Sequence, residues 1–364
     1  PQYTKKGDTT DVRNYRPISI PSSISKLIEK LFLKRINKYL NKFKLLKPCQ
    51  FGFRASSSTN LALLSLTDFL KTSIDNGNFT GSVFLDFTKA FDTISHNILF
   101  SKLESLGITG PSLTFIKNYL LDREQSVCIG GVNSNVKIYN QGVPQGSILG
   151  PLPFCIYIND LPDCLQDSKV ILYADDTTIS ISHKSLPTLI NMLNKELTNV
   201  VEWCRLNNLI LNPLKTQFMV FKTSQKMLPF IPQVFIDNHF IPASNCVCFL
   251  GVILDPHLKF TNHILYVKQK TAFGIRSLIK SHPFFSLEAL LSLYFAFIHS
   301  HITYGITSWG NIHIHHGETL IFRLYSTFRI RPFALLPTVH FILMLPRSFR
   351  LTVFLQCLAY LIFT

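Results

Sequence analysis

The stretch Tyr173-Ala174-Asp175-Asp176 constrains the fold more than any other part of this sequence. The runs on either side, 170–172 and 177–181, are apolar and rich in β-branched residues. Runs of this kind, separated by a few turn residues, predict two strands joined by a tight turn. The turn then carries two adjacent carboxylates at its tip. Adjacent like charges raise the demand for a counter-charge, and a bound divalent metal ion is the simplest one.

An isolated Asp-Asp pair is better explained as an ordinary acidic turn, because Asp is common in turns, where its side chain bonds its own backbone. A third carboxylate shifts that balance. Residues 82–87 form a predicted strand that ends in Asp86-Phe87. Two hard cations about 4 Å apart need several converging carboxylates. Asp86 and Asp175 therefore predict a metal site assembled from adjacent strands of one sheet.

The composition points to a polyanionic partner. The chain has 364 residues, of which 47% are hydrophobic, enough for a buried core and two or more domains. Its net charge of +15 favours nucleic acid as partner, with an anionic membrane surface as the alternative. The polar, basic start has neither a signal peptide nor an initiator Met, which predicts a non-secreted, intracellular piece of a longer polypeptide. The eight scattered cysteines predict reduced thiols, and a zinc site at Cys246 and Cys248 is not expected.

Apolar residues at helical spacing predict a series of helices. The first begins after Ser22 and is amphipathic, with a basic outer face that suits solvent and a nucleic-acid backbone about equally. Its apolar positions are Ile24, Leu27, Ile28, Leu31, Phe32 and Ile36. Further helices are predicted at 61–70 with Thr59 or Asn60 as N-cap, 99–106, 113–121, 186–206, 263–281 and 287–301. A β-patterned stretch covers 127–139.

Two loop-like segments carry candidate substrate contacts. Residues 141–151 contain three Gly and two Pro, so we expect a loop that brings backbone close to a substrate, with a plain connector as the alternative. Arg54 ends a short aromatic segment. Its planar guanidinium suits phosphate oxygens, and an exposed structural Arg is the alternative.

Seven motifs occur in an order that resembles one known family. They are 14–19 (NYRPIS), 50–54 (QFGFR), 84–92 (FLDFTKAFD), 142–147 (GVPQGS), 173–176 (YADD), 211–216 (LNPLKT) and 249–252 (FLGV). Together they resemble the reverse transcriptase domain of non-LTR (LINE-type) retrotransposons, from about Lys5 to about Gly310. The resemblance implies an α+β right-hand polymerase. Fingers would span 1–80, a palm with an antiparallel sheet 81–255 with insertions at about 95–140, and a helical thumb 256–310.

The resemblance also implies the chemistry, which is RNA-templated addition of deoxynucleotides to a DNA 3′ end. Asp86 and Asp175 would bind two Mg²⁺ ions, with Mn²⁺ as an alternative, assisted by the Phe87 carbonyl and with Asp176 beside them. Lys215 matches a lysine that donates a proton to pyrophosphate or helps electrostatically. A surface lysine is its alternative. The RNA template, a DNA primer or nicked target DNA, and dNTPs would be the partners, with no membrane partner.

Further residues are implied as nucleotide or nucleic-acid contacts. Phe91 resembles a sugar-discriminating residue whose ring disfavours a 2′-hydroxyl, and it is equally explained as core. Gln145 would pack near the incoming nucleotide and template base, and Arg54 would contact the triphosphate. The remaining candidates are Lys5, Lys6 and Arg16 for RNA, and Leu250-Gly251 for the primer end, where Gly permits close backbone approach.

The sequence departs from the family pattern in two places. Pro153 stands inside an expected helix, where an interior Pro costs roughly 3 kcal/mol unless it lies in the first turn. Residues 311–364 hold one acid, five Arg and no Lys, which indicates an atypical, degenerate tail. A catalytically dead relic, or a maturase-like RNA-binding protein, is therefore the alternative function. An endonuclease is expected in the missing part of the polyprotein, and the nucleus or a cytoplasmic ribonucleoprotein as the location.

Overall fold

The chain folds into two compact units of mixed helix and strand, Pro1–Asn245 and Cys246–Thr364. The computed structural model describes residues 3–4, 15–16, 18–129 and 132–310. No helix among these residues is both long and apolar enough to cross a membrane. The predicted tail, 311–364, lies outside the described residues. The predicted finger, palm and thumb ranges stay predictions.

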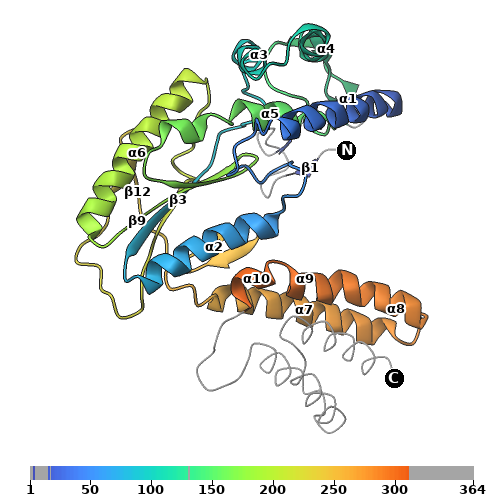
Figure 1. Cartoon of the computed structure of the whole chain (residues 1–364). Coiled ribbons are helices and arrows are strands. Elements are labelled where there is room, and N and C mark those ends of the chain that lie inside the picture. Colours follow the sequence, from blue (N-terminus) through green and yellow to red (C-terminus); the bar gives the residue numbers. More distant parts are fainter. Residues whose placement is uncertain (1–2, 5–14, 17, 130–131, 311–364) are drawn as a thin grey trace. The chain divides into compact units, whose positions relative to one another are not determined.

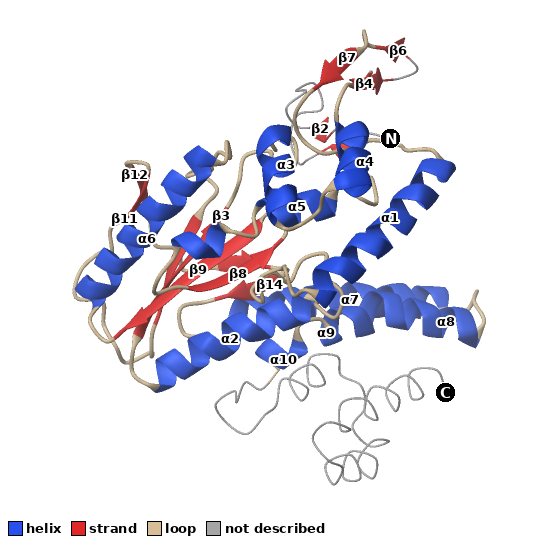
Figure 2. Ribbon diagram, turned by 45° about the horizontal axis from the view of Figure 1, so that its top comes forward, coloured by secondary structure: helices blue, strands red, loops and turns tan. Residues whose placement is uncertain are grey.

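A four-stranded antiparallel sheet forms the centre of the first unit (Figure 2). Its strands are β3 (Phe79–Leu85), β8 (Lys169–Tyr173), β9 (Asp176–His183) and β10 (Gln217–Phe221). Their order across the sheet is β10-β3-β9-β8. The two central strands pair from Phe79 opposite His183 to Leu85 opposite Thr177. The strands predicted around Asp86 and on either side of Asp175 are thus confirmed as neighbours in one sheet.

Helices cover both faces of this sheet (Figure 1). Helix α6 (Leu186–Leu206), at the predicted bounds, packs on β3 and β9, and α2 (Thr59–Asp75) packs on β3 and β8 from the other side. Gly81 leaves room for α6, because a Cβ there would lie 3.2 Å from a Leu193 methyl group. The face toward α2 is lined instead by hydroxyls that bond one another, such as Ser82 and Ser180. Buried hydroxyls need such partners.

Short extended segments cover both edges of the sheet. At the β8 edge, Phe51 N–H donates to the Leu172 carbonyl (2.8 Å), and Leu172 N–H donates to the Cys49 carbonyl (2.9 Å). At the β10 edge, Ser244 N–H donates to the Phe218 carbonyl (2.7 Å). An open strand edge exposes a row of unpaired backbone groups. Both outer strands of this sheet are therefore partly satisfied by the chain itself.

The remaining elements of the first unit pack around one end of the sheet or form small hairpins. The helices are α1 (Ser23–Lys42), α3 (His96–Ser105), α4 (Gly110–Leu120), α5 (Pro151–Tyr157) and a 3₁₀ helix (Leu161–Cys164). The strand pairs are β1 (Tyr3–Thr4) with β2 (Tyr15–Arg16), β4 (Arg123–Gln125) with β7 (Lys137–Tyr139), β5 (Cys128–Ile129) with β6 (Val132–Asn133), and β11 (Val234–Ile236) with β12 (His239–Ile241). The β-patterned stretch at 127–139 is confirmed.

Two local predictions about helix ends were tested by the structure. Pro153 is tolerated because it is the third residue of α5. Backbone N–H groups of the first turn have no partner within the helix, so a proline there removes no bond. The predicted N-cap of α2 is wrong. Ser58 takes that place, and its hydroxyl accepts the N–H of Leu61 (3.2 Å).

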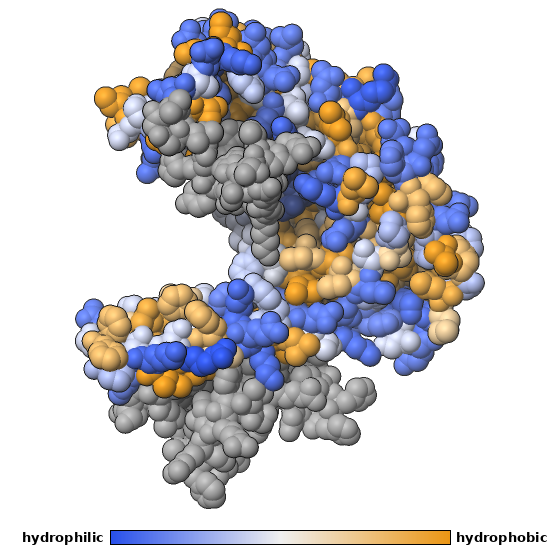
Figure 3. All heavy atoms as spheres, turned by 180° about the vertical axis from the view of Figure 1, so that it is seen from behind, coloured by the Kyte–Doolittle hydropathy of each residue, from blue (hydrophilic) through white to orange (hydrophobic). Residues whose placement is uncertain are grey.

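Helix α1 reverses part of its predicted pattern. Phe32 and Ile36 pack against the core, whereas Ile24, Leu27, Ile28 and Leu31 are exposed, Ile24 to 73%. The one acid of the helix, Glu29, is buried instead. Apolar side chains also interrupt the polar surface on the face of the molecule drawn in Figure 3. Periodicity alone therefore misassigned the inner face of the first half of α1.

The second unit combines one hairpin with a helical bundle. The hairpin strands are β13 (Val247–Phe249) and β14 (Val252–Leu254), and the helices are α7 (Thr261–Ser281), α8 (Leu287–Tyr294), a π-helix (Phe295–His299), α9 (Ser300–Thr303) and α10 (Ile306–Trp309). The helix predicted at 287–301 is thus interrupted by a π-helical turn. Gly274 allows close packing, because a Cβ there would lie 2.8 Å from the Phe297 carbonyl oxygen.

Candidate active site

Three carboxylates gather at one end of the central sheet. Asp86 follows the last residue of β3, while Asp175 and Asp176 lie where β8 turns into β9. Leu85 is opposite Thr177 and Tyr173 is opposite Asp176, so the three acids follow from the strand register. We call Asp86, Asp175 and Asp176 the acidic sheet end. The convergence that the sequence predicted is confirmed.

The turn between β8 and β9 holds Asp175 at its tip. Ala174 and Asp175 are the two central residues of this hairpin, and Ala174 has a positive φ of 54°. A positive φ at the first central position is typical of a type II′ turn, whose twist suits paired strands. Ala174 is buried and Asp175 is exposed. The turn therefore directs the carboxylate, rather than the methyl group, toward solvent.

The predicted Gln50–Arg54 segment packs directly against this turn. A Cβ on Gly52 would lie 2.4 Å from the Ala174 backbone nitrogen, a distance at which something must shift. The Gly52 N–H donates to the buried Gln50 side-chain oxygen (2.8 Å). Gly52 is therefore needed for contact rather than for its φ. The segment fixes the backbone that carries Asp175.

Charge is concentrated at the acidic sheet end. Partial desolvation of its carboxyl raises the pKa of Asp176 to about 6, although the residue keeps an exposed surface, and the negative charges of Asp175 and Asp86 add to the effect. The Lys215 ammonium lies 3.9 Å from Asp86 Oδ2, with the two side chains 61% and 41% exposed. A solvated pair at this distance contributes little to stability. The site thus holds excess negative charge that a cation would relieve.

The backbone on either side of Asp86 is fixed by the segment before β10. Asn212 N–H donates to the Asp86 carbonyl, and Thr88 N–H donates to the Ile210 carbonyl, both at 2.8 Å. In an antiparallel pair, successive residues direct their backbone groups to alternate sides. The Phe87 carbonyl, between these two bonds, therefore points away from Ile210–Asn212 and toward the side of β9. That is the side of Asp175 and Asp176.

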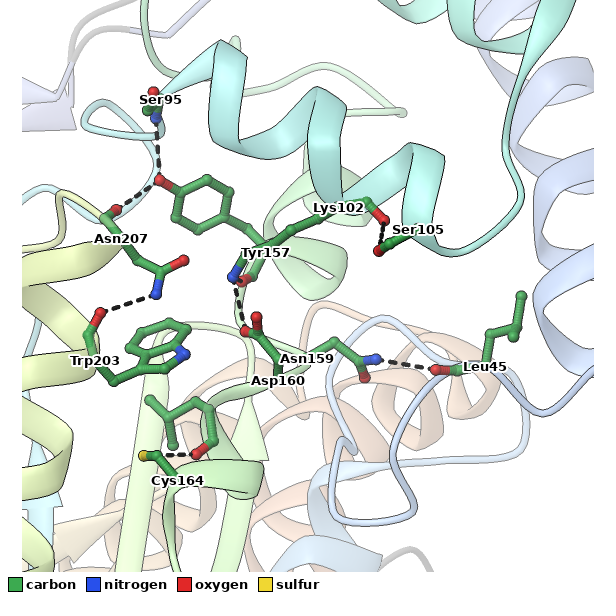
Figure 4. Close-up of polar contacts among 11 residues, drawn as sticks. Leu45, Ser95, Lys102, Ser105, Tyr157, Asn159, Asp160, Cys164, Trp203 and Asn207 are labelled. Carbon is green, nitrogen blue, oxygen red and sulfur yellow. Dashed lines mark hydrogen bonds and ion pairs between the residues drawn. The ribbon is translucent and has the colours of Figure 1, made fainter.

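A polar network anchors this supporting segment (Figure 4). The Tyr157 hydroxyl donates to the Asn207 carbonyl (2.6 Å) and accepts the Ser95 N–H (3.4 Å). Lys102 donates to the Tyr157 carbonyl and to Asp160, each at 2.7 Å. Burial lowers the pKa of Lys102, and Asp160 opposes that effect. The network joins α3, α5 and the end of α6 beneath the segment that holds Asp86.

Residues 141–150, here called the Gln145 loop, pack against the chain just after Asp86. Gly142 N–H donates to the Ile94 carbonyl and Val143 N–H donates to the Phe91 carbonyl, both at 2.8 Å. Gly142 has a φ of +78°, and a Cβ there would lie 2.7 Å from the Asp92 carbonyl oxygen. Gly142 thus brings the backbone of this loop close to the chain after Asp86, and the expected approach to a substrate stays a prediction.

The three residues predicted to contact the nucleotide, Gln145, Phe91 and Arg54, each contact another part of the chain. Gln145 Nε2 donates to Asp92 Oδ1 (2.7 Å), and both residues line a small surface pocket. The half-buried Phe91 ring packs on Phe154 with centroids 4.7 Å apart. Arg54 donates through Nη1 to the Lys47 carbonyl (2.9 Å). The nucleotide-binding roles of these residues stay predictions. The bond with Gln145 shows that Asp92 has a structural contact near the site.

The predicted nucleic-acid contacts belong to other segments of the chain. Lys5 and Lys6 are outside the described residues, and Arg16 is the last residue of β2. Leu250 and Gly251 form the turn of the β13–β14 hairpin in the second unit, with φ of 43° and 80°. The Tyr304 hydroxyl donates to the Leu250 carbonyl (2.7 Å). Positive φ at both central positions is typical of a type I′ turn, which explains the glycine.

Sequence reasoning missed three residues that support the site. Thr216 accepts the Asp86 N–H through its hydroxyl (3.3 Å), Asn212 binds the Asp86 carbonyl, and Glu29 holds the Gln145 loop. Thr216 and Asn212 were within the noted motif 211–216, which singled out Lys215 alone. Glu29 carried a signal, since it is the one acid in a helix of basic and apolar residues.

Comparisons with known proteins agree with this geometry. Residues 3–254 match the family model described as reverse transcriptase (RNA-dependent DNA polymerase). This chain belongs to the reverse transcriptase family. The match covers the acidic sheet end, the Gln145 loop and Lys215. The resemblance inferred from the seven motifs is therefore confirmed.

The similar curated proteins come from mobile elements. The chain is 31% identical over 310 residues to "Probable RNA-directed DNA polymerase from transposon BS" of Drosophila melanogaster, covering 82% of this chain and 34% of that protein. It is 29% identical over 318 residues to "RNA-directed DNA polymerase from mobile element jockey" of the same species, covering 84% and 34%. The chain thus spans about a third of the length of these relatives.

Solved structures of telomerase are also similar to this reverse transcriptase family member. Apo telomerase from Candida tropicalis aligns over 79% of this chain and 54% of its own, with 11% identity and a TM-score of 0.44. At that level the likeness adds nothing to the family match, and the fold class that stands is a mixture of helix and sheet.

Proposed function

We propose that this chain is the polymerase part of a non-LTR retrotransposon protein, an RNA-directed DNA polymerase of right-hand architecture. Its proposed reaction is transfer of a deoxynucleotide to a primer 3′-hydroxyl on an RNA template. The observation that carries the proposal is the acidic sheet end, in which three carboxylates from two strand ends converge within the segment matched to the family.

The residues present fit the divalent ions that the family generally uses. Among the described residues, no three His, Cys, Asp or Glu side chains form a ready-made metal cage. Mg²⁺ seldom needs one, because it keeps several waters and binds through one or two carboxylates plus substrate phosphates. Asp86 and Asp175 would hold two such ions with the Phe87 carbonyl, and Asp176 would stand beside them. When bound, the ions supply activation of the 3′-hydroxyl and neutralisation of phosphate charge.

The protein groups around that centre have separate proposed tasks. Lys215, whose ammonium lies 3.9 Å from Asp86 Oδ2, would give a proton to the departing pyrophosphate or offset its charge. Gln145 would contact the nucleotide and template base, and the Phe91 ring would disfavour a 2′-hydroxyl by leaving it without a partner. Arg54 would bind the triphosphate, since part of its guanidinium is fixed by Lys47.

The partners follow from the same proposal. The net charge of +15 suits an RNA template and a DNA primer or nicked target DNA. Lys5, Lys6 and Arg16 are proposed RNA contacts, and Leu250 and Gly251 are proposed primer contacts. An endonuclease activity would belong to a part of the polyprotein not present here. The proposed location is inside the cell, in the nucleus or in a cytoplasmic ribonucleoprotein.

The test is primer extension on poly(rA)/oligo(dT) with Mg²⁺, comparing the chain with Asp175→Asn. Asp237→Asn is the matched control, because Asp237 is also an exposed acid in a tight hairpin turn of the first unit. We expect Mg²⁺-dependent extension by the unaltered chain and by Asp237→Asn, and none by Asp175→Asn. A folded, soluble chain that binds RNA without extending the primer would overturn the proposal and favour the maturase-like alternative.

A further inference from the structure

Glu29 is a buried acid that is hydrogen-bonded to the Gln145 loop. It lies on α1 with 2% of its surface exposed. Its Oε2 accepts the backbone N–H groups of Ile148 (2.8 Å) and Leu149 (3.2 Å), and its Oε1 accepts the Ser25 hydroxyl (3.2 Å). An ionised carboxylate only accepts hydrogen bonds, so it matches this set of three donors. Bonds with a charged acceptor are also stronger than neutral ones.

The bonds to Glu29 hold the C-terminal end of the Gln145 loop, and other backbone bonds hold its N-terminal end. Gly142 and Val143 are bound to the chain that follows Asp86, and Ile148 and Leu149 are bound to Glu29. Gln145 is midway between the two anchors. Its carbonyl accepts the Ser19 N–H (2.8 Å), from the segment that leads into α1. The position of Gln145 thus depends on α1 through both its own backbone and that of Ile148 and Leu149.

The turn between Gln145 and Ile148 is tightly built. Gly146 has a φ of +94°, and a Cβ there would lie 2.9 Å from the Ser19 carbonyl oxygen. The Ser147 hydroxyl donates to the Pro144 carbonyl and accepts the Gly150 N–H, both at 2.9 Å. Because this turn is so tightly packed, a shift at Ile148 is transmitted to Gln145, three residues earlier in the chain. Loss of the Glu29 bonds would therefore displace or loosen the Gln145 side chain.

We propose that Glu29 is a positioning residue for nucleotide binding, which sets the Gln145 loop by capturing the N–H groups of Ile148 and Leu149. The proposal rests on the proposed function, because it takes Gln145 as the group that meets the incoming nucleotide. Glu29 touches no reacting atom. Its removal changes how well the loop is pre-organised for the nucleotide, and leaves the acidic sheet end intact.

The chain offers a matched control in Glu196 on α6. This acid is 4% exposed, and its Oε1 accepts two successive backbone N–H groups, those of Gln166 and Asp167, both at 2.9 Å. Like Glu29, it holds two successive N–H groups through one oxygen, although its Oε2 is buried without a hydrogen-bond partner. The loop that Glu196 holds precedes β8, at the end of that strand far from Asp175. Glu196→Ala therefore measures the general cost of losing a buried, loop-holding carboxylate.

The experiment is steady-state primer extension with the unaltered chain, Glu29→Ala, Glu29→Gln and Glu196→Ala, with melting temperature recorded for each. We expect Glu29→Ala to raise the KM for dNTP roughly tenfold with a smaller change in kcat. Glu29→Gln retains an acceptor for both N–H groups and should restore most of the affinity. Glu196→Ala should melt earlier while its KM for dNTP stays unchanged.

Each outcome decides a separate question. An inactive unaltered chain counts against the proposed function, not against the role of Glu29. An active chain whose Glu29→Ala and Glu29→Gln variants keep the normal KM would overturn the inference and leave Glu29 a purely structural acid. The same holds if Glu196→Ala raises the KM as much as Glu29→Ala. If Glu29→Ala does not fold, Glu29→Asp, whose shorter side chain withdraws the acceptor, is compared with Glu29→Gln in its place.

Discussion

Two groups of carboxylates in the first unit are used in opposite ways. At the acidic sheet end, three acids are brought together by strand register, and desolvation together with the neighbouring charges raises the pKa of Asp176. Glu29 and Glu196 are instead buried singly, each against two backbone N–H groups. A buried acceptor that meets backbone donors stabilises a fold, whereas clustered like charges cost stability unless a ligand relieves them. The two groups differ both in exposure and in partners. The acids of the acidic sheet end are exposed or half-exposed and lie close to one another, whereas Glu29 and Glu196 are buried against backbone N–H groups.

The strongest test of this contrast is Asp86→Asn. We expect extension activity to fall by roughly a thousandfold or more, because a ligand of the proposed ions loses its charge. The melting temperature should be unchanged or higher, since a repulsive charge is removed. Activity assays and thermal melting of the same preparation check this. A large loss of stability would show that Asp86 is a structural acid like Glu196.

The next effect concerns the cation beside the acidic sheet end. Lys215→Ala should lower kcat by about a hundredfold if the ammonium acts on the departing pyrophosphate. Lys215→Arg keeps the charge and should lose less. The melting temperature should change little, because the Lys215–Asp86 pair is solvated. Single-turnover extension rates measure the effect, and an alanine variant with the normal rate would make Lys215 an ordinary surface lysine.

On the structural side of the contrast, Glu196→Ala should destabilise the folded chain by roughly 2–4 kcal/mol, because two backbone donors lose their partner in a buried place. Glu196→Gln should cost much less, since the amide oxygen still accepts. Urea unfolding monitored by circular dichroism measures both. Equal stability of the alanine variant and the unaltered chain would remove the distinction between the two groups of acids.

The smallest effect is a pH dependence at Asp176. Its pKa is raised in the folded chain to about 6, so between its ordinary value and that one the folded state binds more protons than the unfolded state. Stability of the metal-free protein should therefore fall as pH rises through that window. Asp176→Asn should be more stable than the unaltered chain at pH 7.5 by less than about 1 kcal/mol, given the exposure of the side chain, and no more stable at pH 4. Melting curves in EDTA at the two pH values check this sign.

Much of the site could be predicted from sequence because its acids follow strands with clear apolar patterns. Asp86 and Asp175 were placed together by that reasoning, and α6 was predicted at its observed bounds. The role of Glu29 could not be predicted, because its partners are 119 and 120 positions away along the chain. The apolar spacing of Ile24, Leu27 and Leu31 predicted the wrong inner face for the same reason. Helical periodicity shows which residues share a side, but it does not show which side meets distant partners such as the N–H groups of Ile148 and Leu149.

The covered edges of the sheet have a practical consequence for cutting the chain into smaller pieces. A recombinant fragment that starts after Arg54 would lose the segment bound to Leu172, and one that stops before Ser244 would lose the bond to Phe218. Either truncation would uncover an apolar strand able to pair with another molecule. We therefore expect both fragments to aggregate on expression, even though each retains every acid of the acidic sheet end. The boundaries of a minimal folded fragment are therefore set by the sheet edges rather than by the motifs.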